Sequence, residues 1–224
     1  MLAPGPSFAR FLLNASPGFN KFRDIEVLNP YSDAGIADIT RAFCRKFYSS
    51  EGQRLLVLGI NPGRKGGGCT GIPFTDPVAL DLFCGIPNAL KKERELSSTF
   101  IYEVVGAFGG PEIFYSKVLL SAVCPVGFVR QGKNFNYYDD EALYNKMQKY
   151  LHESLQFQSG LGVNRKCVIS LGKENAAQIR KINEKLNLFE KVIELEHPRY
   201  IMQYKRKNLA SYVKKYRDLI LDLN

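Results

Sequence analysis

Three chemically capable side chains each follow a run of apolar residues that we expect to form a buried strand. They are Asn61, Asn134 and His197. Ligands of an open parallel sheet bind beyond the carboxyl ends of its strands, so these side chains are the first candidates for a functional site. An amide can orient a partner but cannot take its proton, whereas an imidazole exchanges a proton near neutral pH. A lone histidine is more often structural than catalytic, but its position after a strand favours a functional role for His197.

The first of these side chains lies in a glycine-rich segment, GINPGRKGGGCTGIPF, at residues 59–74. The segment is not a phosphate-binding P-loop, because it lacks Gly-Lys-Ser/Thr, and it does not match G-x-G-x-x-G. Its glycines can be explained by a tight turn alone. A turn does not explain the polar Asn61 at the end of a buried strand.

Four continuous apolar runs predict buried strands. They cover residues 54–60, 117–124, 166–171 and 191–195. Helical spacing occurs at residues 33–50, 97–108, 139–158, 173–187 and 202–223. This alternation predicts an α/β fold, a single three-layer domain over residues 1–224 with a central, mostly parallel four-stranded sheet flanked by helices. We expect residues 1–31, which are rich in Pro, Gly and Asn, to form an irregular arm packed on that domain.

The charge of the chain favours a polyanionic partner. The 224 residues include 31 Lys and Arg against 22 Asp and Glu, so the formal net charge is 31 − 22 = +9. Nucleic acid is the first candidate and an acidic membrane surface the second. A basic surface that serves only solubility is the simpler alternative.

Composition disfavours several other classes of protein. No apolar stretch is long enough to span a bilayer, and the first residues, MLAPGPSFAR, do not resemble a signal peptide. We therefore expect a protein of the cytoplasm or nucleus that is neither secreted nor bound to a membrane. We also expect a monomer. Five widely spaced cysteines without a C-x-x-C pair, and only two histidines, predict no metal site and no iron–sulfur cluster. No cofactor is expected.

Taken together, these segments resemble the uracil-DNA glycosylase superfamily, and within it the single-strand-selective monofunctional branch. The glycine-rich segment has the same length as the branch motif G-M-N-P-G-P-F-G-M-A-Q-T-G-V-P-F. The matching positions are Gly59, Asn61, Pro62, Gly63, Gly66, Thr70, Gly71, Pro73 and Phe74. Shorter matches are Asn29-Pro30, Cys124-Pro125, Gly132-Lys133-Asn134 and His197-Pro198-Arg199. The resemblance extends from about residue 28 to about residue 205.

The resemblance implies a monofunctional DNA glycosylase of base excision repair. Such an enzyme flips uracil, or a related deaminated or 5-substituted base, out of DNA and hydrolyses its N-glycosidic bond, which leaves an abasic site. Phe74 would stack on the flipped base, and Asn134 would bind the base edge in a pattern that suits uracil and mismatches cytosine. Gly63 would leave room at C5 of the base.

The resemblance also implies the catalytic roles. Asn61 would hold the attacking water, and His197 would donate a hydrogen bond to uracil O2 as negative charge develops there. The backbone N–H near Ile60 would assist. The motif places no lysine to form a Schiff base, so water is expected to be the nucleophile.

The chain departs from the family pattern in the loop that wedges into the duplex. The family sequence H-P-S-P-R is shortened to His197-Pro198-Arg199. Candidates for the wedge are Arg199, Tyr200, Ile201 and Met202. Candidates for contact with DNA are Arg64, Lys65, Arg199, Tyr200 and Lys205.

Two alternatives to a DNA glycosylase stay open at this point. One is a non-catalytic protein that binds damaged DNA on the same fold. The other is an α/β hydrolase of free nucleosides, which the net charge of +9 disfavours because a nucleoside carries no phosphate.

Overall fold

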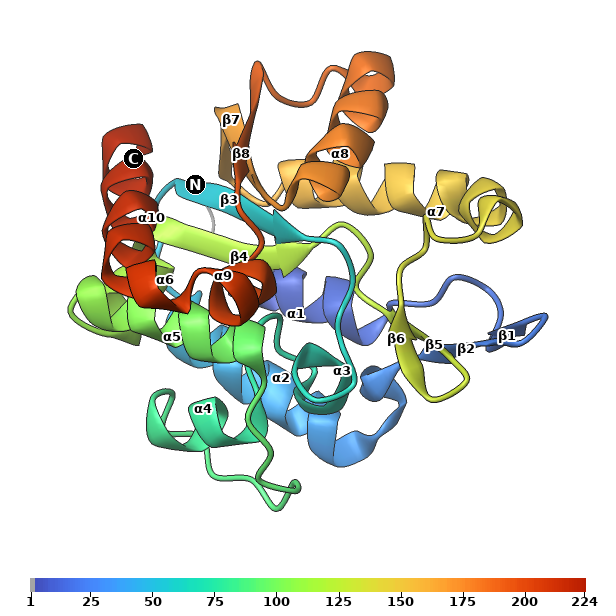
Figure 1. Ribbon diagram of the computed structural model, residues 1–224, viewed down its shortest axis with the longest axis horizontal. Helices are drawn as coiled ribbons and strands as arrows, with labels where there is room; N and C mark the ends of the chain where they lie inside the picture. Colours follow the sequence, from blue (N-terminus) through green and yellow to red (C-terminus); the bar gives the residue numbers. More distant parts are fainter. Residues whose placement is uncertain (1–2) are drawn as a thin grey trace.

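The computed structural model describes residues 3–224, and its centre is a four-stranded parallel sheet (Figure 1). The strand order is β4-β3-β7-β8, and every neighbouring pair is parallel. The strands are β3 (Arg54–Gly59), β4 (Val118–Ala122), β7 (Val163–Leu171) and β8 (Lys191–Leu195). The prediction of a four-stranded, mostly parallel sheet is confirmed.

Helices flank this sheet on both sides, which confirms the layered α/β fold. In Figure 1, α7 and α8 lie on one side of the sheet, and α5, α9 and α10 lie together on the other. The longer helices are α2 (Ala34–Phe47), α5 (Leu96–Ala107), α7 (Glu141–Ser159), α8 (Lys173–Leu186) and α10 (Leu209–Leu223). The shorter ones are α3 (Gly67–Thr70), α4 (Pro77–Leu82), α6 (Pro111–Lys117) and α9 (Pro198–Tyr204), with 3-10 turns η1 (Pro30–Ser32) and η2 (Arg206–Asn208). No helix within residues 3–224 is both long and apolar enough to cross a membrane.

The central strands form because their apolar side chains are removed from water on both faces. All six residues of β3 and all five of β4 are buried. Burial of apolar surface contributes roughly 25 cal/mol per Å². The polar groups needed for function must therefore come from the segments that follow the strands.

The expectation that the arm at residues 1–31 is irregular is wrong for residues 3–31, the part that the structure describes. The segment forms α1 (Gly5–Leu13), whose side chains Phe8 and Leu12 are each 1% exposed. It then forms β1 (Lys21–Phe22) and β2 (Ile25–Leu28). The many Pro and Gly residues obscured the helical spacing of apolar residues in this nine-residue helix, which tertiary burial stabilises. That residues 1–224 form a single domain stays a prediction.

A second sheet, which the sequence did not predict, is antiparallel. Its order is β1-β2-β5-β6, with β5 (Gly127–Arg130) and β6 (Lys133–Phe135). β2 pairs with β5 so that Leu28 faces Gly127. This sheet places the segment around Asn134 beside the end of β3.

The predicted helix over 202–223 is also wrong at its start. The chain forms α9 first, with Pro198 at a favourable N-terminal position, and then turns through η2 before α10 begins at Leu209. Proline fits the first turn of a helix because it lacks the N–H that would be unpaired there. The segment that follows His197 is therefore helical from its first residue.

Arg54 is a charged residue at the start of a buried strand, and its side chain is 1% exposed. Its guanidinium donates to the carbonyl oxygens of Tyr115 (2.8 Å), Gly52 (3.2 Å) and Ser50 (3.1 Å). Removal of the guanidinium leaves the buried oxygen of Tyr115 without this donor and frees the oxygens of Gly52 and Ser50.

We expect Arg54→Met to lower the free energy of unfolding by about 3 kcal/mol, because it keeps the apolar volume but deletes charge-assisted hydrogen bonds. Urea denaturation with an unchanged m-value would measure this loss. Arg45→Met, at an exposed position of α2, is the matched control. Equal stabilities of the two variants would contradict this account of Arg54.

Candidate active site

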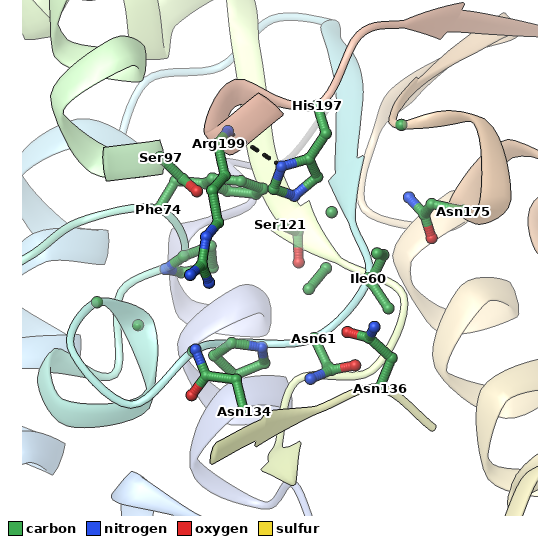
Figure 2. A pocket seen from close by; sticks show the side chains of 18 of the residues that line it. Ile60, Asn61, Phe74, Ser97, Ser121, Asn134, Asn136, Asn175, His197 and Arg199 are labelled. Atoms are coloured by element: carbon green, nitrogen blue, oxygen red, sulfur yellow. Dashed lines mark hydrogen bonds between the residues drawn. The ribbon is translucent and has the colours of Figure 1, made fainter. Parts of the chain in front are cut away.

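A cavity of about 660 Å³ opens at the carboxyl edge of the parallel sheet (Figure 2). Eight residues singled out from the sequence line it. They are Ile60, Asn61, Gly63, Phe74, Asn134, His197, Arg199 and Tyr200. Arg64, Lys65 and Lys205 do not line it. The fold thus gathers residues from the segments after β3, β5 and β8 around one space.

Asn61 follows β3, and a single hydrogen bond orients its amide. Nδ2 donates to the backbone oxygen of Phe135 in β6 at 3.1 Å. Oδ1 is buried and has no hydrogen-bond partner within residues 3–224. A buried polar atom without a partner is unfavourable unless a ligand or a water supplies one. Asn61 therefore presents an acceptor for a ligand or a water.

His197 occupies the N-cap of α9, and this position defines its tautomer. Its Nδ1 accepts a hydrogen bond from the backbone N–H of Arg199 at 3.1 Å. In the neutral ring the proton must then be on Nε2. Burial, and secondly the positive charge of Arg199, lower the pKa of His197 to about 4. Near neutral pH the residue is therefore an uncharged hydrogen-bond donor.

Asn134 lies in β6, and its amide is held beside the glycine-rich segment. Its Oδ1 accepts from the backbone N–H of Arg64 at 3.1 Å, which distinguishes the oxygen from the nitrogen. A Cβ atom on Gly63 would lie 2.9 Å from Asn134 Nδ2. A glycine at position 63 thus lets the amide come close. Arg64 contributes through its backbone, and its side chain is exposed.

Phe74 adopts a backbone conformation that is rare for a side-chain-bearing residue, with φ of +55°. Its ring lies against the end of β3, where a Cβ atom on Gly59 would be only 2.4 Å from Phe74 Cζ. The ring centroid is 6.3 Å from that of His197, and Figure 2 shows the two rings side by side. Strained residues of this kind concentrate at functional sites.

Thr70 and Thr75 hold the turn that carries Phe74. Thr70 Oγ1 donates to the backbone oxygen of Thr75 at 2.7 Å and accepts from Ile72 N at 3.1 Å. Thr75 Oγ1 is 3.0 Å from Tyr102 OH in α5. These bonds explain why the motif contains a threonine that does not face the cavity.

Three buried polar residues of the cavity were not predicted as site residues. Ser97 in α5, Ser121 at the end of β4 and Asn175 at the start of α8 line it. Asn175 Nδ2 donates to Leu58 O at 2.9 Å, whereas Asn175 Oδ1 and Ser121 Oγ have no partner in the described part of the chain. The position of Asn175 just after the third strand was the signal that could have identified it.

The remaining predicted DNA contacts lie outside the cavity. Lys65 Nζ forms an ion pair with Glu93 Oε2 at 2.8 Å, and its side chain is more than half exposed. Lys205 caps the C-terminus of α9. As for metals, no group of three His, Cys, Asp or Glu that could hold an ion occurs between residues 3 and 224.

Comparison with known proteins reveals one family. The family model described as the uracil DNA glycosylase superfamily matches residues 46–220. The crystal structure of wild-type SMUG2 from Pedobacter heparinus is 37% identical in sequence and superposes with a TM-score of 0.93. The match covers 100% of this chain and 99% of that chain. No curated protein is significantly similar to the chain.

The low pKa of His197 generates a testable prediction. Between the ordinary histidine pKa of 6.5 and about 4, the folded protein binds fewer protons than the unfolded chain. The contribution of His197 to the free energy of unfolding therefore decreases as the pH falls through this range. NMR titration should show His197 with its proton on Nε2 and a midpoint near pH 4, below that of His152 in α7. A midpoint near 6.5 would contradict the proposed environment.

Proposed function

The chain belongs to the uracil DNA glycosylase superfamily, and from that premise we propose that it excises uracil from DNA with water as the nucleophile. Membership supports a DNA repair hydrolase that acts on N-glycosyl bonds. One observation carries the finer proposal: an oriented amide oxygen, on Asn61, and a neutral imidazole donor, on His197, share one cavity. The product would be an abasic site.

The base would enter the cavity after it leaves the stack of the DNA. Phe74 would stack on its face. Asn134 Nδ2 would donate to O4, and Asn134 Oδ1 would accept from N3–H. This oxygen already accepts from Arg64 N, but a carbonyl oxygen has a second lone pair. Cytosine presents the opposite donor and acceptor pattern at these atoms, so the fixed amide would reject it.

The bond cleavage would use two neutral groups. Asn61 Oδ1 would accept a hydrogen bond from the water that attacks C1′. As the C1′–N1 bond breaks, its electron pair leaves with the base, and negative charge accumulates on O2. His197 Nε2–H and the backbone N–H of Ile60 would stabilise that charge. Since an amide takes no proton, the water proton would pass to solvent, and the uracil anion would be protonated after release.

The DNA backbone would cross the rim of the cavity. Arg199 and Tyr200 lie on that rim, in the first turn of α9. The side chains of Arg64 and Lys65 lie in the loop after β3, and Lys205 ends α9. Contacts from these cations to phosphates would make binding weaken steeply with salt.

The role of Asn61 can be tested by base release from oligonucleotides that contain one uracil. We expect wild type to give strand cleavage only after alkali, in the presence of chelator, because it would leave an abasic site. Asn61→Ala should lower kcat about 10²- to 10³-fold, since the water loses its orienting acceptor. Asn145→Ala, on the exposed face of α7, is the matched control.

Binding of uracil-containing DNA without base release, and with no change in Asn61→Ala, would instead support a non-catalytic damaged-DNA-binding protein. Cleavage without alkali, or a protein–DNA adduct trapped by borohydride, would contradict water as the nucleophile.

The space at Gly63 generates a second prediction. Gly63 adjoins the Asn134 amide that would bind O4, and C5 is the neighbouring atom of the base. We therefore expect excision of 5-hydroxymethyluracil as well as uracil. Gly63→Ala should weaken both activities, mainly through KM, because its Cβ would displace Asn134 Nδ2. If the wild type excised uracil but no 5-hydroxymethyluracil, this would contradict the proposal that Gly63 leaves room for a substituent at C5 of the base.

A further inference from the structure

Two exposed tyrosines lie on the helix that begins at His197. Tyr200 is 43% exposed and Tyr204 is 70% exposed. They are one helical turn apart in α9, and their ring centroids are 5.4 Å apart at an interplanar angle of 44°. Tyr200 also lines the cavity, so the pair extends from its rim outward along the surface.

Packing of α9 does not account for this pair. The helix buries Pro198, Ile201 and Met202 and packs against α5 (Figure 1). Tyr200 and Tyr204 lie on the other face, where their rings have each other as aromatic neighbours. Exposed aromatic rings at the rim of a binding cavity mark an interaction surface.

Three cations follow the tyrosine pair in the chain. Lys205, Arg206 and Lys207 follow Tyr204 directly, and the last two of these are exposed. The neighbouring carboxylate, Glu196, forms an ion pair with Lys215 Nζ at 2.9 Å. Flat aromatic rings followed by cations match the chemistry of a nucleic acid strand, whose bases stack and whose phosphates are anionic.

We propose that Tyr200 and Tyr204 form a stacking platform for an unpaired base next to the target nucleotide, with Lys205–Lys207 along its phosphates. This inference rests on the proposed function, since it places the target base in the cavity. A nucleotide in a single strand can turn its base onto the tyrosines. In a duplex the same base is held by its pairing partner. The platform would therefore favour single-stranded substrates.

The test uses single-stranded oligonucleotides with one uracil and measures both base release and binding by fluorescence anisotropy at fixed salt. Because stacking of one base on an aromatic ring changes affinity by about 5- to 150-fold, the double variant Tyr200→Ala/Tyr204→Ala should raise KM and Kd by a factor in that range. Tyr200→Phe/Tyr204→Phe should retain most of the affinity, because phenylalanine preserves the stacking face.

A second set of substrates isolates the flanking base. In these, an abasic spacer replaces the nucleotide on the 5′ or the 3′ side of uracil. On one of these two spacer substrates, the alanine variant and the wild type should have the same Kd, because the base that stacks on the tyrosines is absent. Phe157→Ala, which removes an exposed ring of a stacked aromatic pair that does not line the cavity, is the matched control.

Three results would overturn the platform: no change in Kd for the alanine variant, an equal loss on both spacer substrates, or a larger loss on duplex than on single strands. The last result would identify the tyrosines as a duplex wedge. Anisotropy with single strands that contain no uracil measures binding alone, because no base can be released from them. If wild type released no base, the proposed function would fail, while a loss of binding in the alanine variant would still support the stacking surface.

Discussion

The parallel register of β3 with β4 and β7 is the constraint on which the rest of this structure depends. Because neighbouring strands run in the same direction, the segments that leave them all emerge at one edge of the sheet. The strands β3 and β4 are buried along their whole length, so they offer little room for chemistry. The segments after them carry polar residues, and the common edge turns these separate segments into one site.

Within that site, the polar side chains are oriented before any ligand arrives. The amide of Asn61 is held by Phe135 O, that of Asn134 by Arg64 N, and the imidazole of His197 by Arg199 N. Dipoles that are already oriented need no reorganisation when charge develops, which is the main source of electrostatic catalysis. Backbone groups make all three of these hydrogen bonds, so the orientation of the side chains depends directly on the local fold.

The groups proposed for the chemistry are uncharged although the chain carries a net charge of +9. Its central groups are two amides and an imidazole whose pKa burial lowers to about 4. A neutral donor stabilises an anionic leaving group without a strong attraction to phosphate. Arg64, Lys65 and Lys205 instead lie outside the cavity, where they can bind a polyanion without competing for the reacting atoms. The residues proposed to bind phosphates and those proposed to cleave the glycosidic bond thus lie at different places in the structure.

Much of the site could be predicted because its signals are local. Apolar runs indicated the four central strands, and β8 has the predicted bounds, Lys191–Leu195. The glycine-rich motif identified Asn61, Gly63 and Phe74, all of which line the cavity. The sequence alone thus determined the layered α/β fold, the family and eight of the residues that line the cavity, since apolar runs and a fixed motif are read from neighbours in the chain.

Other properties were decided by tertiary structure. The antiparallel pairing of β2 with β5 joins residues about a hundred positions apart, which no local periodicity records. Local sequence patterns also do not record the hydrogen bond from Asn61 to Phe135 O or the desolvation that lowers the pKa of His197. Burial and hydrogen-bond geometry arise only when distant segments meet. The sequence therefore determined which side chains are available, and the packed structure determined their orientation and charge.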